Sequence, residues 1–167
     1  MNKKIVIALM LCALPLFAMA QKIGHVNTAA VVDAMPERVS IEKTLNDMQA
    51  KWETQLLKMR EEYASKIKEY QKNESTMSPA LKEAMQNEIG DAEQRINTLV
   101  QTASSELQAE QQKLMQPVIE KIKKAIEQVG AENSFTYIID ESTQVFVYIA
   151  PTSDDVTALV KQKLGIK

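Results

Sequence analysis

One apolar stripe with helical spacing runs through residues 41–70 and constrains the fold more than any other feature. Its side chains follow a 4-3-4 spacing: Ile41, Leu45, Met48, Trp52, Leu56, Met59, Tyr63, Ile67 and Tyr70. Such a stripe predicts one long helix that buries a single face. A helix of roughly 40 residues is about 60 Å long, more than the remainder of a small chain can cover. The helix therefore needs a partner along its length.

The segment after residue 80 repeats this spacing and is the expected partner. Its positions are Leu81, Met85, Glu88, Ala92, Ile96, Leu99, Ala103, Leu107, Glu110, Leu114, Val118 and Lys121. Two matched stripes in succession predict an antiparallel hairpin. A repeat of about 3.67 residues per turn keeps such a pair nearly straight. Because Glu88, Glu110 and Lys121 interrupt the second stripe, we expect a thin seam between the helices.

The hairpin arm is predicted to span 37–129, with its tip near 73–79. At the tip, Ser78 can cap the second helix, and Pro79 suits a first helical turn because no backbone donor is needed there. Pro117 removes a backbone hydrogen bond inside the second helix. We therefore expect a kink or a new helix at Pro117.

The N-terminal residues 1–20 have the pattern of a secretory signal peptide. Two lysines precede an apolar run at 5–19, which ends in Ala18-Met19-Ala20, so cleavage is expected after Ala20. The alternative is a membrane anchor, but this run is shorter than the ~20 residues that span a bilayer. We expect no integral membrane anchor. Cys12 is the only cysteine, so the cleaved chain would contain no disulfide and no thiolate site.

Short segments on both sides of the arm, 21–36 and 130–167, are predicted to form a β-rich body. Residues 22–26 form a predicted strand, and Asn27 can cap a brief helix after it. On the other side of the arm, Gly130 is a plausible end for the second long helix.

Residues 135–139 and 145–149 are rich in β-branched and aromatic residues and predict a β-hairpin. Thr152 or Ser153 can cap a final helix after it. Both faces of this hairpin are apolar, more than a small body can cover. We expect the second face to contact other copies of the chain, because a monomer exposing it would risk aggregation. The candidate interface residues are Ile23, Val26, Ile138, Val145, Val147 and Ile149.

The sequence contains no pattern that predicts an enzyme, a cofactor site or a metal site. His25 is the sole histidine and is interpreted as structural. The four glycines are isolated, which excludes the glycine-rich loops that hold phosphates. Two of the 20 basic residues lie in the signal, so the cleaved chain would carry 18 basic and 22 acidic residues. This balance gives no indication of nucleic-acid binding.

Around the arm, the order of short stretches resembles the Skp/OmpH family of periplasmic chaperones. The resemblance includes the signal peptide, KIGHVN at 22–27, FTYIID at 135–140 and VYIAPTSDDVT at 147–157, followed by an amphipathic helix. It extends over essentially all of the chain after residue 20. It implies an α+β, mostly α fold in which a small β-sheet body forms a homotrimer and projects three tentacle-like hairpins.

The resemblance also implies a function: an ATP-independent periplasmic holdase that keeps unfolded outer-membrane proteins from aggregating in the cavity between its arms. The family's best-known members are strongly basic, whereas the predicted arm here carries 14 basic and 16 acidic residues. We therefore expect apolar contact and confinement to dominate over electrostatic capture. For the same reason we do not carry over lipopolysaccharide binding.

Four apolar residues lie off the predicted stripes or at the tip and are candidates for contact with the client: Leu57, Met77, Ile89 and Val100. The alternative is that they are ordinary scattered surface residues. A second function also stays open, that of a periplasmic coiled-coil adaptor in an export or efflux assembly. Such adaptors usually have larger β-domains and an anchor, so the chaperone is preferred.

Overall fold

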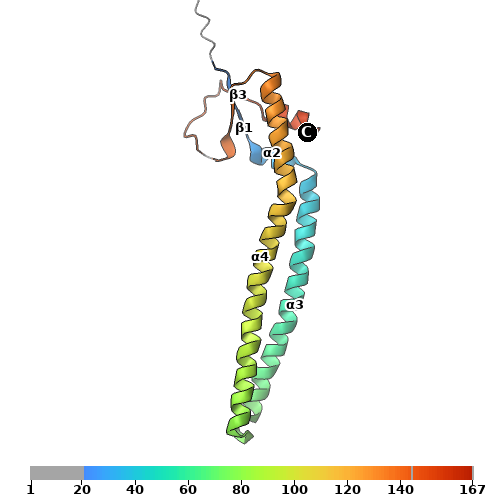
Figure 1. The fold of residues 1–167 in the computed structure, drawn as a ribbon, viewed down its shortest axis with the longest axis vertical. Helices are drawn as coiled ribbons and strands as arrows, with labels where there is room; N and C mark the ends of the chain where they lie inside the picture. Colours follow the sequence, from blue (N-terminus) through green and yellow to red (C-terminus); the bar gives the residue numbers. More distant parts are fainter. Residues whose placement is uncertain (1–20, 144, 167) are drawn as a thin grey trace, which may run out of the picture.

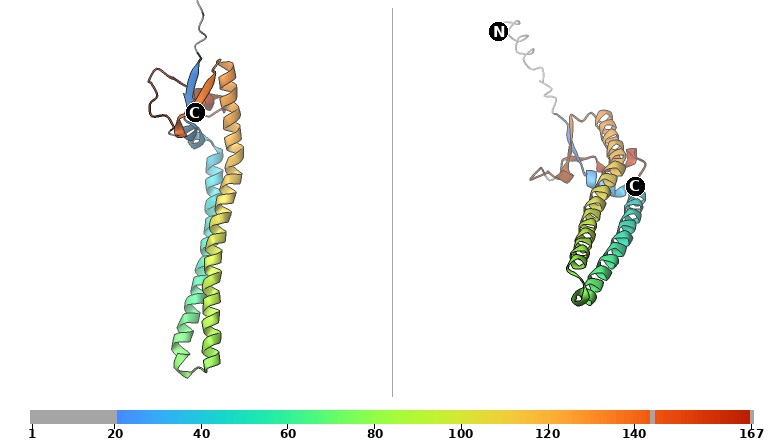
Figure 2. Two further views of the ribbon diagram at one scale, coloured as in Figure 1. Left: turned by 60° about the vertical axis from the view of Figure 1, so that its left-hand side comes forward. Right: turned by 60° about the horizontal axis from the view of Figure 1, so that its bottom comes forward.

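The computed structural model describes residues 21–143 and 145–166, so the predicted signal peptide lies outside the described residues. The fold is α+β and mostly helical, as the sequence predicted: a long two-helix arm projects from a small body (Figure 1). Two further views show the arm helices side by side along their length (Figure 2). Within the described part of the chain, no helix combines the length and apolarity needed to cross a membrane.

The arm consists of α3 (Glu37–Asn73) and α4 (Pro79–Glu132), joined at the tip by the short 3-10 helix η1 (Glu74–Thr76). The Ser78 hydroxyl oxygen accepts a hydrogen bond from the backbone N–H of Leu81 at 3.3 Å. Pro79 occupies the first position of α4, where its missing N–H costs no hydrogen bond. The turn at the tip is therefore stabilised by local capping.

Of the two outcomes expected at Pro117, a new helix is wrong, because α4 continues through this residue. The helix also passes Gly130, its predicted end, and ends at Glu132. Pro117 and Lys113, whose carbonyl loses its helical partner, both lie on the exposed side of the helix. Water can therefore satisfy that carbonyl. Beyond the helix, Ser134 takes the left-handed conformation, with φ of 57°.

The sheet has the order β2-β1-β3, formed by β1 (Ile23–Val26), β2 (Tyr137–Asp140) and β3 (Asp154–Asp155), and both pairings are parallel. The predicted β-hairpin of 135–139 with 145–149 is therefore wrong. A parallel pair needs a long crossover, and the whole arm between β1 and β2 provides it. Both edges of β1 are occupied by β2 and β3, and 145–149 pairs with no strand among the described residues.

Two short helices complete the body. The Asn27 side chain caps α2 (Thr28–Ala34) by accepting from the backbone N–H of Ala30 at 2.8 Å, as expected. The last helix, α5 (Thr157–Lys163), starts later than predicted, because Ser153 precedes β3 and cannot cap it. The carboxylate of Asp155 instead accepts from the backbone N–H of Thr157 at 2.8 Å.

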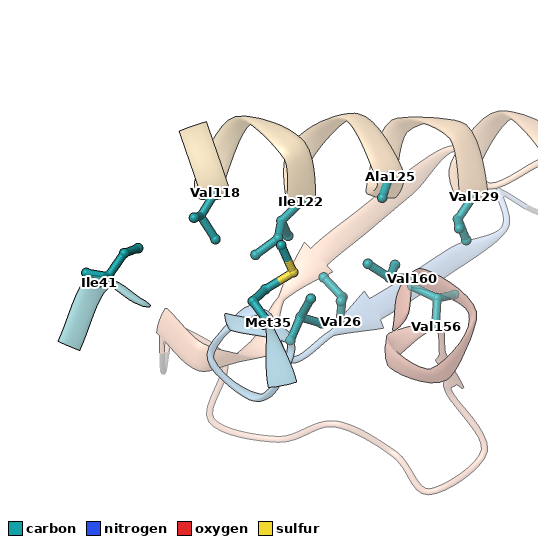
Figure 3. Close-up of a cluster of buried hydrophobic side chains, with 10 residues drawn as sticks. Val26, Met35, Ile41, Val118, Ile122, Ala125, Val129, Val156 and Val160 are labelled. Carbon is teal, nitrogen blue, oxygen red and sulfur yellow. The ribbon is translucent and has the colours of Figure 1, made fainter. Parts of the chain in front are cut away.

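One hydrophobic cluster lies where the body meets the base of the arm (Figure 3). Each of β1, α2, α3, α4 and α5 contributes to it: Val26, Val31, Met35, Ile41, Val118, Ile122, Ala125, Val129, Val156 and Val160. Val26 was predicted as an oligomer-interface residue, but it is buried in this core. Strand alternation explains the error: Gly24 and Val26 face the core, whereas Ile23 and His25 face outward.

Candidate functional site

Along α3, the predicted stripe is shielded from solvent by α4. Ile41 is buried, and the eight stripe positions that follow it are half-buried, while most residues between them are exposed. Two helices alone cannot enclose the side chains between them, so the seam stays open at its sides. The arm therefore carries a long, partly accessible apolar surface.

Along α4, the seam departs from the predicted stripe near the tip. Leu81 and Glu88 are exposed, whereas Ile89 is half-buried, so Ile89 lies on the seam and not off it as predicted. An apolar side chain gains more from this position than a carboxylate does. Ala92 is buried, and Ile96 and Leu99 continue the half-buried row.

Polar contacts connect the two arm helices at the edge of the seam. The Lys66 ammonium donates to a Glu88 carboxylate oxygen at 2.6 Å, and the Gln86 amide donates to the Tyr70 hydroxyl at 2.7 Å. The hydrogen bond from Lys66 lowers the pKa of Glu88 below its usual value. Because these groups are exposed, the pairs contribute little stability and mainly set which residues face one another.

Two grooves open on the seam on either side of Trp52. The larger, of about 660 Å³, is lined mainly by Trp52, Met59, Arg95 and Leu99 together with polar residues of α4. The smaller, of about 370 Å³, is lined mostly by apolar residues, among them Trp52, Leu56 and Leu107, together with Gln49, Glu53 and Ser104. Apolar contacts of this kind suit many different side chains, because they impose no hydrogen-bond geometry.

The four client-contact candidates have different surroundings. Leu57 and Val100 are 60% and 44% exposed on the outside of the arm. Met77 is half-buried at the tip, and Ile89 packs in the seam. Trp52 was not among the candidates, although it borders both grooves. Its position on the stripe predicted only that it packs against the second helix. The structure shows in addition that its side chain is partly exposed to the two grooves.

In the body, exposed apolar side chains lie in two places, on the sheet face turned away from the core and on the segment after β2. We call this set the outer face: Ile23, Tyr137, Val145, Phe146, Val147 and Tyr148. All six are exposed, Val147 completely. Of the other interface candidates, Ile138 packs against the core and Ile149 is half-buried.

A polar network holds the carboxyl end of β2. The Asp140 carboxylate accepts from the Thr28 hydroxyl at 2.6 Å and from the Ser142 hydroxyl at 2.8 Å, and also from both backbone N–H groups. Burial alone would raise the pKa of Asp140, but these hydrogen bonds outweigh it, so the pKa lies below its usual value. The network joins β2 to the start of α2.

His25 is placed between the two outer strands of the sheet. Its Nδ1 lies 3.2 Å from the Ser153 hydroxyl, and its Nε2 lies 3.5 Å from a Glu141 carboxylate oxygen. The other Glu141 oxygen accepts from the Asn27 side-chain amide at 2.9 Å. Among the described residues, no group of three or more histidine, cysteine or acidic side chains is arranged to hold a metal ion.

Comparison with known proteins gives three consistent similarities. The model of a family described as "Outer membrane protein (OmpH-like)" matches residues 22–164. The chaperone protein Skp of Pectobacterium atrosepticum is 22% identical over 143 residues, and that of Yersinia enterocolitica 23%; each match covers 86% of both chains. A crystal structure described as an OmpH-like outer membrane chaperone, from Caulobacter crescentus, superimposes with a TM-score of 0.70 at 16% identity. That match covers 86% of this chain and 83% of the other.

Proposed function

Since this chain belongs to the OmpH-like family of outer membrane proteins, we propose that it is an ATP-independent holdase chaperone of the periplasm. Its clients are unfolded outer-membrane β-barrel proteins, kept from aggregating in a cavity between helical arms. The two Skp relatives are chaperones by name, which supports this role.

The observation that carries the proposal is the half-buried apolar seam along the arm. A holdase needs no catalytic group, only many weak contacts that an unfolded chain can make and break. The grooves beside Trp52 and the exposed Leu57 and Val100 offer such contacts over both arm helices. When several arms act together, individually weak contacts add up through a high effective concentration.

We further propose that three copies assemble through their bodies. In this arrangement 1–20 is a signal peptide removed after Ala20, 21–36 and 130–167 form the oligomerisation body, and 37–129 is the arm. The outer face supports the proposal, because a small body with this many large apolar side chains exposed to water gains stability when other copies cover them.

Client capture is proposed to rest on apolar contact. The near balance of 14 basic and 16 acidic residues over 37–129 provides no strong field to attract an acidic client or lipopolysaccharide. Client affinity should therefore change little between low and high salt. Release then follows from the client's own folding or transfer, without a nucleotide.

The first experiment measures light scattering while a urea-unfolded outer-membrane barrel protein is diluted into buffer with increasing amounts of the protein. Suppression that saturates near three chains per client is expected for a trimer holding one client. If scattering is unchanged at every ratio, the holdase proposal fails and a structural adaptor becomes the better explanation.

Paired variants test whether the arm makes the contact. The double variant Leu57→Ser, Val100→Ser removes two exposed apolar side chains and should raise the concentration for half-suppression about three- to fivefold, a loss of roughly 0.6–1 kcal/mol. Val39→Ser is the matched control, because Val39 is exposed on the same type of helix but lies at the base of α3. Equal effects in both variants would argue against client contact along the arm.

A further inference from the structure

One exposed side of α4 carries a row of side-chain amides. Its six members are separated by three, four or seven positions, so they lie on one face of the helix, and all are exposed. We call them the amide stripe: Asn87, Gln94, Asn97, Gln101, Gln108 and Gln112. At 1.5 Å per residue the stripe is about 40 Å long. The seam residues Ala92, Ile96 and Leu99 lie on the opposite side of α4, so the stripe is turned away from α3.

No charged side chain interrupts this face between Asn87 and Gln112, a stretch that the structure describes completely. At about 100° per residue, each charged residue of the stretch lies about 80° or more around the helix from the centre of the stripe. The charged residues are Glu88, Asp91, Glu93, Arg95, Glu106 and Glu110. The acidic and basic groups of α4 are therefore kept to its other sides.

The side of α3 that is turned away from the seam has the opposite character. It carries exposed charged residues along its length: Lys43, Asp47, Glu53, Glu61, Lys68 and Lys72. Contact with water therefore does not explain the amides, because both faces are exposed in the same arm. Helix stability does not explain them either, since asparagine is a weaker helix former than glutamate or lysine. The uncharged face indicates a partner against which charges would be costly.

The backbone of an unfolded polypeptide has the chemistry that this face requires. A carboxamide offers both a donor and an acceptor, which match the N–H and C=O groups of a peptide. Covering a charged side chain costs more free energy than covering a neutral amide that keeps its hydrogen bond. An unfolded chain presents these backbone groups at almost every residue, whatever its sequence.

The amide stripe is continuous with the apolar grooves of the arm. Gln94 also lines the larger groove beside Trp52. At the end near the body, a groove of about 650 Å³ is lined mainly by four glutamines, among them Gln108, and by Met115 and Ile119. An apolar client side chain can therefore enter a groove while the backbone next to it pairs with the stripe.

We propose that the amide stripe binds the backbone of the unfolded client and pairs N–H and C=O groups that the client has not yet paired within itself. This rests on the proposed holdase function and adds the chemistry by which the arm distinguishes an unfolded chain from a folded one. When the client folds, its strands pair these groups with one another, so the stripe loses its partners and the client leaves. Because the stripe is neutral, these contacts are insensitive to salt.

Two fluorescently labelled peptides of alternating valine and serine test the proposal. One has ordinary peptide bonds, and in the other ester bonds replace alternate peptide bonds, which keeps the extended shape but removes backbone donors. Fluorescence anisotropy should show about three- to tenfold tighter binding of the ordinary peptide, because each hydrogen bond to an exposed amide contributes little. Equal binding of the two peptides, or no binding of either, would overturn the proposal.

A matched pair of triple variants identifies the stripe. The stripe variant removes three of its amides: Gln101→Ala, Gln108→Ala and Gln112→Ala. The control variant removes three exposed amides elsewhere on the arm helices: Asn46→Ala, Gln71→Ala and Gln128→Ala. Both should keep their helix content, because alanine is the better helix former. The stripe variant should bind the two peptides alike and need about three- to tenfold more protein for half-suppression, whereas the control should behave as the parent.

The outcomes separate this proposal from the holdase function. If the stripe variant suppresses aggregation as well as the parent does, the holdase function stands and the stripe is not its client site. If the parent itself suppresses nothing, both proposals fall. Sedimentation equilibrium distinguishes a client from a second copy. Loss of self-association in the stripe variant alone would assign the stripe to contacts between copies and overturn client binding, whereas unchanged association supports it.

Discussion

The two ends of α4 carry apolar residues at similar helical spacing, yet their burial differs. Near the body, four positions are buried: Val118, Ile122, Ala125 and Val129. Along the arm, Ile96, Leu99, Ala103 and Leu107 remain half-buried. In the body, α2, α5 and β2 contact the helix, whereas in the arm only α3 faces it (Figure 1). The number of neighbouring elements, and not the helix pattern, decides whether a stripe becomes a core.

This difference assigns the two regions different physical roles. Apolar burial stabilises by about 25 cal/mol per Å² removed from water, so the body holds more stability per residue than the arm. Regions with few buried contacts open at lower free energy than the core. The arm can therefore adapt its surface while the body keeps its structure.

A matched pair of methionines gives the largest expected effect. Met35→Ala should destabilise by about 2–5 kcal/mol, because Met35 is almost completely buried in the core. Met59→Ala should cost about 1 kcal/mol or less, because Met59 is half-buried beside an open groove that can close or fill with water. Urea unfolding at one protein concentration measures both. Similar losses would mean that the arm is packed as tightly as the body.

A pair of glycines sharpens the comparison with changes of opposite sign. In the body, a Cβ on Gly24 would lie 2.8 Å from the Phe135 ring and 3.1 Å from the Asp154 carbonyl oxygen. Gly24→Ala should therefore cost about 1–3 kcal/mol through overpacking.

In the arm, a Cβ on Gly90 meets no atom within 4 Å. Gly90→Ala should stabilise α4 by about 1 kcal/mol, because alanine is the better helix former. The expected readout is slower amide exchange around residue 90, with the unfolding midpoint raised slightly. If Gly90→Ala also impairs suppression of aggregation, flexibility at this position contributes to client binding. A destabilised Gly90→Ala would contradict the open surroundings of Gly90.

The smallest expected effect is the loss of stability at low pH that comes from protonation of Asp140. The pKa of Asp140 is lowered in the folded chain, so its ionised form stabilises the fold above the unfolded value near 3.8. That contribution is lost as the pH falls through the lowered pKa. The urea midpoint should therefore fall between pH 5 and pH 2.

Asp140→Asn should flatten this pH dependence. It should also lower the free energy of unfolding at pH 5 by about 1 kcal/mol, because an amide makes weaker hydrogen bonds here than the carboxylate. Asp47→Asn, on the exposed side of α3, is the control and should retain the parent slope. If the urea midpoint of Asp140→Asn depends on pH as steeply as that of the parent, the hydrogen bonds of Asp140 do not stabilise the body.

The sequence by itself determined the local structure of the chain. The period of the α3 stripe places all nine positions on the shielded side, since side-chain direction in a helix depends only on spacing. Asn27 and Ser78 cap the helices that they were expected to cap, because capping involves residues two or three positions apart. The position of Ile89 on the seam was not predicted. Glu88 and Ile89 lie on either side of the row through Met85 and Ala92, so a small rotation of the helix decides which of the two faces α3.

The tertiary structure decided which strands pair and which apolar residues remain uncovered. The sequence favoured a hairpin of neighbouring strands, but β1 and β2 pair across the whole arm, with Ile23 opposite Tyr137. Val26 enters the core while Val147 is fully exposed, although both are valines in β-prone segments. Propensity measures only how well a residue suits a strand. The partner on each edge and the cover on each face come from residues far apart in the chain, and only the packed fold brings those together.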